Sequence, residues 1–200
     1  MKSLLNILES REMIKAIMIS DKPRYCAKIM NGEKTIEVRR NKALASAIQK
    51  LIGENGYADI YVYCSKDKSD KETLKFMRGR YGCMKNYDPY DKVIFKFRCY
   101  KVEEISWQMG VYQLEQQGFN DFLDKCCLGF CEIKNYLNRK NGYAIHISDL
   151  EIFDKPKELC EFESTKQHLV DVGQIQPILQ NIRLTKAPKN FCYIEVEDND

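Results

Sequence analysis

Long apolar runs are missing from this sequence. No stretch approaches the roughly 20 consecutive apolar residues that a membrane-spanning helix needs, so we expect no contact with a membrane. The apolar residues near the beginning are too few for a signal peptide, because Glu9, Arg11 and Glu12 end them early. We therefore expect the protein to be cytoplasmic.

Paired cysteines are missing too. The nine cysteines are scattered, and no two of them have the Cys-x-x-Cys spacing that is typical of structural zinc sites. The nearest approach to a cluster is Cys126, Cys127 and Cys131, with His168 as a distant fourth group. We expect no metal and no cofactor, and we interpret the cysteines as small buried side chains of an intracellular protein.

Histidine is scarce, with two in the chain. On a strand, His146 would share a face with Ala144 and Ser148, and no nucleophile or carboxylate is tied to it by spacing. This favours a hydrogen-bonded structural histidine over a catalytic one.

A strong excess of one charge is also missing. The net charge is +3, which is too small to indicate a nucleic-acid-binding protein by itself. Its distribution is uneven, because the segment from Lys66 to Lys92 holds eight basic and five acidic residues and so accounts for the whole surplus.

What is present fits one domain. The length of 200 residues is enough for a single hydrophobic core, and we find no internal repeat and no low-complexity linker. We expect residues 1–12 to be an N-terminal extension, with translation starting at Met1 or Met13. Residues 13–200 would then form a single domain with a basic insertion at about 66–91.

The basic insertion mixes Lys and Arg with aromatic residues and glycines. This composition suits a phosphate backbone with exposed bases, and it equally suits a solvated excursion pinned to the domain by its aromatic side chains. A protein partner could also bind here. No feature of the sequence indicates an oligomeric state.

Alternation of apolar and polar residues predicts most of the secondary structure. It predicts strands at 14–20, 57–65, 93–99, 143–152 and 191–197, and helices at 22–31 and 41–51. It also predicts a helical stretch that begins at Trp107 and runs in pieces from about 111 to 139. Residues 156–190 read as a wrapping segment with a short helix or two. On the strand 57–65, Tyr57, Tyr61 and Tyr63 share one face, which indicates half-buried packing or, less often, a stacking surface for bases.

The segment Lys34 to Arg40, after the Asn31-Gly32 turn, is the strongest site signal. Period two puts Thr35, Glu37 and Arg39 on one face of a strand, and Glu37 and Arg39 then lie roughly 7 Å apart at Cα. The carboxylate and the guanidinium could pair or hold one ligand together, with Lys34 as a mobile cation at the end of the strand. The alternative is a set of ion pairs on a solvated sheet face.

The residues from Ile14 to Arg40 contain a strand, a short helix entered through Pro23, and the pattern Gly32-x-Lys34-Thr35-x-Glu37-x-Arg39. This segment resembles the opening of an ASCH domain, a family of PUA-like β-barrels. A second match, 142–150 followed by 153–156, is similar to ASCH proteins of firmicute bacteria and their phages, and 187–193 fits their closing segment. The resemblance implies an α+β fold, a PUA-like barrel of mixed and antiparallel strands decorated with several α-helices.

The resemblance also implies binding of RNA, a nucleotide or a nucleoside in a cleft beside the Lys-Thr-x-Glu-x-Arg strand. Arginine can grip a phosphate or a base edge in a fork, and a carboxylate can accept from an exocyclic amine. Carried over onto this sequence, the ligand-binding residues are Lys22, Tyr25, Lys34, Thr35, Glu37, Arg39 and Arg40.

Two other classes of function stay open. ASCH proteins linked to RNA cleavage imply a metal-independent ribonuclease, for which Lys34 and Glu37 would be the catalytic residues. ASCH amidohydrolases use a Lys, a Thr and a Glu; here Lys34 matches, Glu37 stands in place of the Thr, Thr35 points the opposite way from Lys34, and Glu115 is the nearest candidate for the third residue. The remaining class is a protein-interaction adaptor acting through the insertion.

Overall fold

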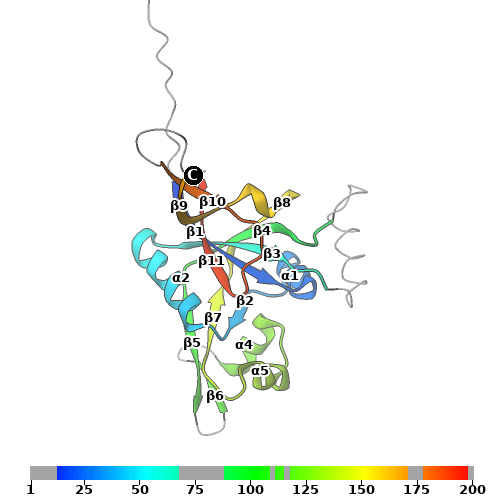
Figure 1. The fold of residues 1–200 in the computed structure, drawn as a ribbon. Helices are drawn as coiled ribbons and strands as arrows, with labels where there is room; N and C mark the ends of the chain where they lie inside the picture. The colour runs from blue at the N-terminus through cyan, green and yellow to red at the C-terminus, as the bar shows by residue number, and fades with distance from the viewer. Residues whose placement is uncertain (1–12, 68–87, 109–110, 115–117, 171–177, 198–200) are drawn as a thin grey trace, which may run out of the picture.

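The strands form two open sheets (Figure 1). The computed structural model describes residues 13–67, 88–108, 111–114, 118–170 and 178–197. The larger sheet has the order β10 (Ile178–Arg183), β9 (Glu163–Val170), β11 (Phe191–Glu197), β1 (Met13–Asp21), β3 (Ala58–Cys64), β4 (Lys92–Cys99), β8 (Ser148–Lys157). The smaller sheet has the order β2 (Ile36–Arg39), β7 (Gly142–His146), β5 (Val102–Gln108), β6 (Val111–Gln113).

The predicted α+β class is confirmed. All strand pairs are antiparallel except β1 and β3, which run parallel and are connected through α1 (Pro23–Met30), β2 and α2 (Lys42–Asn55). In the part of the chain that the structure describes, neither sheet closes on itself, so the strands form two packed sheets and not one closed barrel.

Helices α1 and α2 cover one face of the larger sheet, as Figure 1 shows. Asn41 caps α2, because its side chain accepts hydrogen bonds from the backbone N–H groups of Ala43 and Leu44. The helix runs past Gly53 and ends at Gly56, whose φ of +83° is the left-handed conformation that glycine adopts at no steric cost. The helix therefore continues beyond residue 51, where the sequence predicts its end.

The opposite face of the larger sheet is also covered. Every residue of β3 is buried, and the Tyr61 ring packs 6.1 Å from Phe153 and 5.4 Å from Phe162, centroid to centroid. A sheet covered on both faces leaves no row of side chains free to stack with bases. Tyr61 and Tyr63 are thus packing residues, the first of the two interpretations of the tyrosine row.

The smaller sheet packs on α4 (Phe119–Cys126) and α5 (Phe130–Leu137), and together they form the lower part of the molecule in Figure 1, which we call the small lobe. Trp107, predicted to begin a helical stretch, lies instead in β5, opposite Tyr112 of β6, with ring centroids 4.5 Å apart. Cross-strand aromatic pairs of this kind stabilise a hairpin, and tertiary pairing overrides a weak helical period.

Two further segments differ from expectation. The single strand predicted at 143–152 is two strands in different sheets, β7 and β8, and the chain passes between them at Ile147. The described part of the segment 156–190, which excludes 171–177, holds a 3-10 turn, η1 (Leu159–Glu161), and the antiparallel strands β9 and β10 in place of the predicted short helix or two. Pairing with strands that are distant in the sequence determines the conformation of both segments, and the local pattern of apolar and polar residues does not reveal such pairing.

Residues 1–12 and most of the basic insertion, 68–87, lie outside the described residues, so their predicted roles stay predictions. Among the described helices, none has the length and apolar character required to cross a membrane.

Candidate functional site

A pocket of about 540 Å³ opens where β1 ends, between α1, β2 and α5. Pockets of a few hundred Å³ with a few convergent polar groups are the usual binding sites for small ligands. Strand β2 supplies its polar wall: Glu37 and Arg39 line the pocket, while Ile36 packs into the core of the small lobe and Val38 both packs there and borders the pocket. The predicted alternation along β2 is therefore present.

Glu37 is a buried carboxylate held by two cations. Its Oε1 lies 2.8 Å from Arg39 Nε, although the N–H is not aligned with the oxygen, and its Oε2 lies 3.1 Å from Lys34 Nζ. Burial would favour the neutral acid, but Lys34 and Arg39 outweigh it and hold the pKa of Glu37 below its ordinary value. Glu37 is thus ionised near neutral pH.

Lys34 is not the mobile cation that its position before the strand predicts. Its side chain is 2% exposed, and Nζ donates to the backbone oxygens of Ile36 at 2.9 Å and Cys126 at 3.0 Å, besides pairing with Glu37. Cys126 is the last residue of α4, where the helix dipole favours a positive charge. Burial opposes the charge, yet Glu37 and Asp21 hold the pKa of Lys34 above its ordinary value.

Arg39 is fixed from two directions. Its Nη2 donates to the backbone oxygen of Ser20 at 3.0 Å and lies 3.9 Å from Asp21 Oδ2, while Nε faces Glu37. Although burial opposes its charge, Glu37 and Asp21 raise the pKa of Arg39 still further. The guanidinium is a permanent cation in the pocket wall.

Asp21 lines the pocket but is absent from the ligand-binding residues predicted from the sequence. Lys22, not Asp21, is the N-cap of α1, and Asp21 Oδ1 accepts the Lys22 backbone N–H at 2.8 Å. Its Oδ2 is buried and has no hydrogen-bond partner among the residues that the structure describes. Burial and the neighbouring Glu37 raise the pKa of Asp21 to about 7, against the opposing pull of Arg39 and Lys34. An acidic residue directly after a buried apolar strand is the signal that could have identified it.

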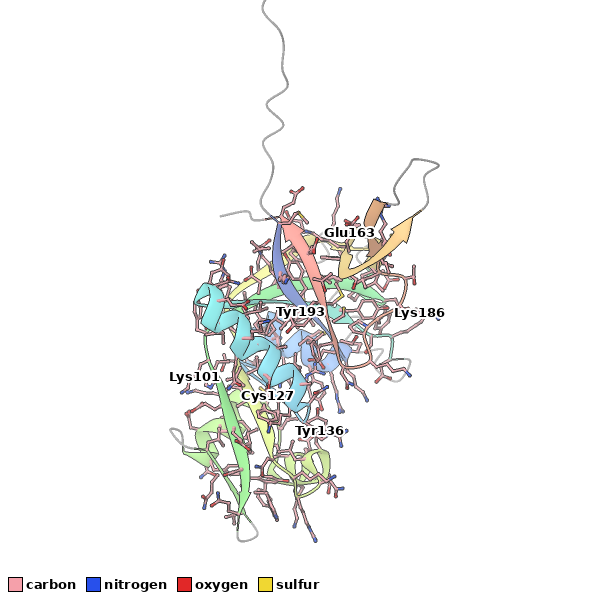
Figure 2. The ribbon with its side chains drawn as sticks, turned by 60° about the vertical axis from the view of Figure 1, so that its left-hand side comes forward. Lys101, Cys127, Tyr136, Glu163, Lys186 and Tyr193 are labelled. Carbon is pink, nitrogen blue, oxygen red and sulfur yellow. The ribbon has the colours of Figure 1, made fainter. Side chains whose placement is uncertain are left out.

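Two tyrosines and two exposed cations frame the opening. Tyr25 on α1 and Tyr136 on α5 line the pocket, and Figure 2 shows Tyr136 between the ribbons of α1 and α5. The Arg24 guanidinium lies 4.6 Å from the centroid of the Tyr25 ring, and its Nη2 donates to the Tyr25 hydroxyl at 2.8 Å. Lys22 is exposed, with Nζ 4.0 Å from Asp67 Oδ2.

Five of the seven predicted ligand-binding residues come together here: Lys22, Tyr25, Lys34, Glu37 and Arg39. Thr35 is exposed outside the pocket, and only its backbone is engaged, with the N–H donating to Lys125 and the oxygen accepting from Ile147. Arg40 also lies outside and stacks on the Tyr136 ring, with Cζ 4.9 Å from its centroid. That any of these residues binds a ligand stays a prediction.

Away from the pocket, His146 Nε2 lies 2.6 Å from Glu103 Oε2, which fits the hydrogen-bonded structural role expected for it. Within the described ranges, no group of three or more His, Cys, Asp or Glu side chains is arranged to hold a metal ion. Glu115, the candidate third residue of an amidohydrolase, lies outside them.

Comparison with known proteins gives structural neighbours only. No protein family and no curated protein matches the sequence. Among solved structures, the crystal structure of ASCH from Zymomonas mobilis is similar, with 16% identity, a TM-score of 0.44, and coverage of 86% of this chain and 88% of the other. A tyrosine-to-phenylalanine mutant of that protein gives 16% identity, a TM-score of 0.43, and coverage of 86% and 91%. These neighbours are ASCH proteins, the family that the sequence motifs resemble.

Proposed function

We propose that the protein binds RNA or a free nucleotide, with one nucleotide unit held in the pocket between α1, β2 and α5. A nucleotide offers a flat base, a polar base edge and an anionic phosphate. The observation that carries the proposal is that one pocket combines two tyrosine rings at its opening, Tyr25 and Tyr136, with a buried set of charged groups from β1 and β2. Base stacking on aromatic rings is a common mode of single-stranded RNA recognition.

The phosphate is expected at the rim. Inside the pocket, the three acceptors around Lys34 Nζ already use its three hydrogens, and the carboxylate of Glu37 repels a second anion. Lys22 and Arg24 are exposed at the opening. Lys22 Nζ lies 4.0 Å from Asp67 Oδ2 and Arg24 donates to the Tyr25 hydroxyl through one nitrogen, so both keep further N–H donors for a phosphate that approaches from solvent. Cations in this position neutralise phosphates and make the affinity depend on salt.

Binding of a labelled single-stranded RNA, measured by fluorescence anisotropy over a range of salt concentrations, tests the proposal. We expect Tyr25→Ala to weaken binding by about 1–3 kcal/mol through lost stacking. Lys22→Ala should reduce the slope of log affinity against log salt by about 1, because one phosphate contact is lost.

Lys50→Ala is the matched control for Lys22→Ala. Lys50 is an exposed lysine on α2, paired with Glu54 and outside the pocket, so its loss removes the same charge from a different face. Binding of neither RNA nor a free nucleotide by the wild-type protein, or an equal reduction of the salt slope in the Lys50 variant, would contradict the proposal.

A metal-independent hydrolase acting on RNA or on a modified nucleoside is the second candidate, and Asp21 is the observation that favours it. Lys34 stays protonated and Glu37 is engaged with two cations, so neither suits proton transfer in the way the sequence motif implied. A carboxyl with a pKa of about 7 does suit it. Shortening of the RNA during the binding measurement, abolished by Asp21→Asn, would favour the hydrolase. The adaptor role of 66–91 stays a prediction.

A further inference from the structure

Asp21 Oδ2 is an unpaired carboxyl oxygen in the wall of the pocket. Asp21 is 8% exposed, and Oδ2 has less than 1 Å² of its surface open to solvent and no hydrogen-bond partner among the described residues. The nearest cation, Arg39 Nη2, is 3.9 Å away, which is too far for a hydrogen bond. Buried polar groups without a partner are rare in proteins and call for an explanation such as a missing ligand.

Most other charged groups of the wall are engaged. Lys34 Nζ has three acceptors, both oxygens of Glu37 face cations, and Arg39 Nη2 donates to Ser20. Arg39 Nε is the exception, because it is buried and its N–H is not aligned with Glu37 Oε1. The pocket wall therefore has an unfilled acceptor, Asp21 Oδ2, next to a guanidinium that has an unfilled donor. A nucleobase edge, which places an N–H beside a carbonyl oxygen or a ring nitrogen, is complementary to such a pair.

We propose that Asp21 reads the base, with Oδ2 accepting a hydrogen bond from an N–H of a nucleobase held in the pocket beside Arg39. The inference rests on the proposed function and adds the part of the ligand that enters the pocket and the residue that recognises it. Rotation of the carboxyl about its last torsion, which is a broad and soft one, turns Oδ2 from the wall toward the ligand. Because Oδ1 moves with it, this rotation weakens the hydrogen bond that Oδ1 accepts from the Lys22 N–H. The phosphate stays outside, at Lys22 and Arg24.

A proton accompanies this recognition. The charged and titratable groups that face Asp21 are Lys34, Glu37 and Arg39 at β2, Cys26 on α1 and Tyr136 on α5. Lys34 and Arg39 stay charged, Glu37 stays ionised, and burial raises the pKa values of Cys26 and Tyr136 so that both stay neutral. Asp21 alone of this set changes its charge near neutral pH, and only its ionised form is a pure acceptor.

The sign of the pH dependence follows. A base N–H stabilises the carboxylate, so below about pH 7 the free protein must release a proton before it binds. We expect the affinity for a nucleoside to be roughly tenfold higher at pH 8 than at pH 6, with close to one proton released per nucleoside bound at pH 6 and close to none at pH 8.

Isothermal titration calorimetry of the wild-type protein at pH 6 and pH 8, in buffers of different ionisation enthalpy, measures both quantities. The probes are uridine, guanosine, cytidine and adenosine, whose bases do not titrate near neutral pH, and sulfate as an anion that cannot donate an N–H. Asp21→Asn should bind with an affinity independent of pH. Asp59→Asn is the control, because Asp59 is a buried aspartate paired with Arg98 at the other end of β3.

The outcomes separate this inference from the proposed function. Equal or tighter nucleoside binding at pH 6, proton uptake, or displacement of the nucleoside by sulfate would overturn the role of Asp21 while leaving nucleotide binding in place. Binding of single-stranded RNA without any binding of nucleosides would do the same. If neither RNA nor nucleosides bind, the proposed function itself is wrong. The proton count on the wild-type protein decides the matter even if Asp21→Asn fails to fold.

Discussion

Asp21 is a residue that the fold holds at an energetic cost. A carboxyl that is buried next to another carboxylate, Glu37, resists ionisation, and its pKa of about 7 compares with 3.8 for the free side chain. Residues held in an unfavourable state cluster at functional sites, where the cost is tolerated because function needs it. Asn at this position would keep the acceptor for the Lys22 N–H and remove the charge.

The cost predicts how stability changes with pH. Between about pH 4 and pH 7 the folded protein keeps the Asp21 proton while the unfolded chain has lost it, so rising pH favours unfolding; above about pH 7 both are ionised and the effect is constant. We expect the free energy of unfolding of wild type, minus that of Asp21→Asn, to fall by up to about 1.4 kcal/mol per pH unit across this window. Urea unfolding of both proteins from pH 5 to pH 8 measures it; a difference that stays constant with pH refutes the buried neutral acid.

At the scale of elements, α5 packs against the first residue of β7 at a distance that only glycine permits. A Cβ on Gly142 would lie 2.6 Å and 2.9 Å from the two terminal carbons of Leu137, which is fully buried in the core of the small lobe, and 3.4 Å from the Arg39 backbone oxygen. Because β7 is paired with β2, this close approach also sets where Glu37 and Arg39 stand relative to α5.

Two alanine substitutions that we expect to change the free energy of unfolding in opposite directions test this packing. Gly142→Ala should lower the free energy of unfolding by about 1–3 kcal/mol, because the terminal carbons of the fully buried Leu137 would have to shift to make room for the new methyl group. Gly53→Ala, inside α2 with nothing within 4 Å of the added carbon, should raise it by about 0.5–1 kcal/mol. Thermal or urea unfolding measures both. Destabilisation of similar size in the two variants would mean that the contact with Leu137 is not the cause.

At the scale of the whole molecule, the pocket lies at the boundary between the small lobe and the larger sheet. The two parts share core residues, since Ile145 of β7 packs in the cluster beneath α1 and α2. Arg39 adds a polar connection, because its guanidinium, on β2 of the small lobe, donates to the backbone oxygen of Ser20 on β1 of the larger sheet. We therefore expect the lobes to unfold together.

Lys34→Met tests this coupling. Removing one partner of a buried ion pair leaves the other without compensation, which costs about 3–5 kcal/mol, and replacing both partners in Lys34→Met/Glu37→Gln should recover part of it. Fluorescence of Trp107, the one tryptophan of the chain and part of the small lobe, and circular dichroism of the whole chain should report the same shifted urea midpoint. An earlier transition in fluorescence than in circular dichroism would show that the small lobe unfolds alone. Lys50→Met, on an exposed face, should change stability by less than about 0.5 kcal/mol.

Local patterns predicted the elements whose residues carry a full period. Three elements lie close to the residues at which the sequence predicts them: the strand after the Asn31-Gly32 turn, helix α2 and the last strand, β11. Trp107 and the segment 156–190 were misassigned because pairing with distant strands, and not their own period, decides their conformation. The role of the tyrosines of β3 could not be decided from the sequence, since alternation does not show whether a second layer of structure covers the face on which they lie.

By itself, the sequence determined that Glu37 and Arg39 of β2 share a face, because the side chains of an extended chain alternate between its two faces whatever surrounds it. Only the tertiary structure decided their electrostatic state. The backbone oxygen of Cys126, 92 residues away, accepts a hydrogen bond from Lys34 and holds it in place. Burial at the end of β1 leaves the Oδ2 atom of Asp21 without a hydrogen bond from any described residue, although Arg39 lies beside it. The solvation of a charge depends on every group that packs around it, and those groups are brought there by the fold and not by neighbouring positions in the chain.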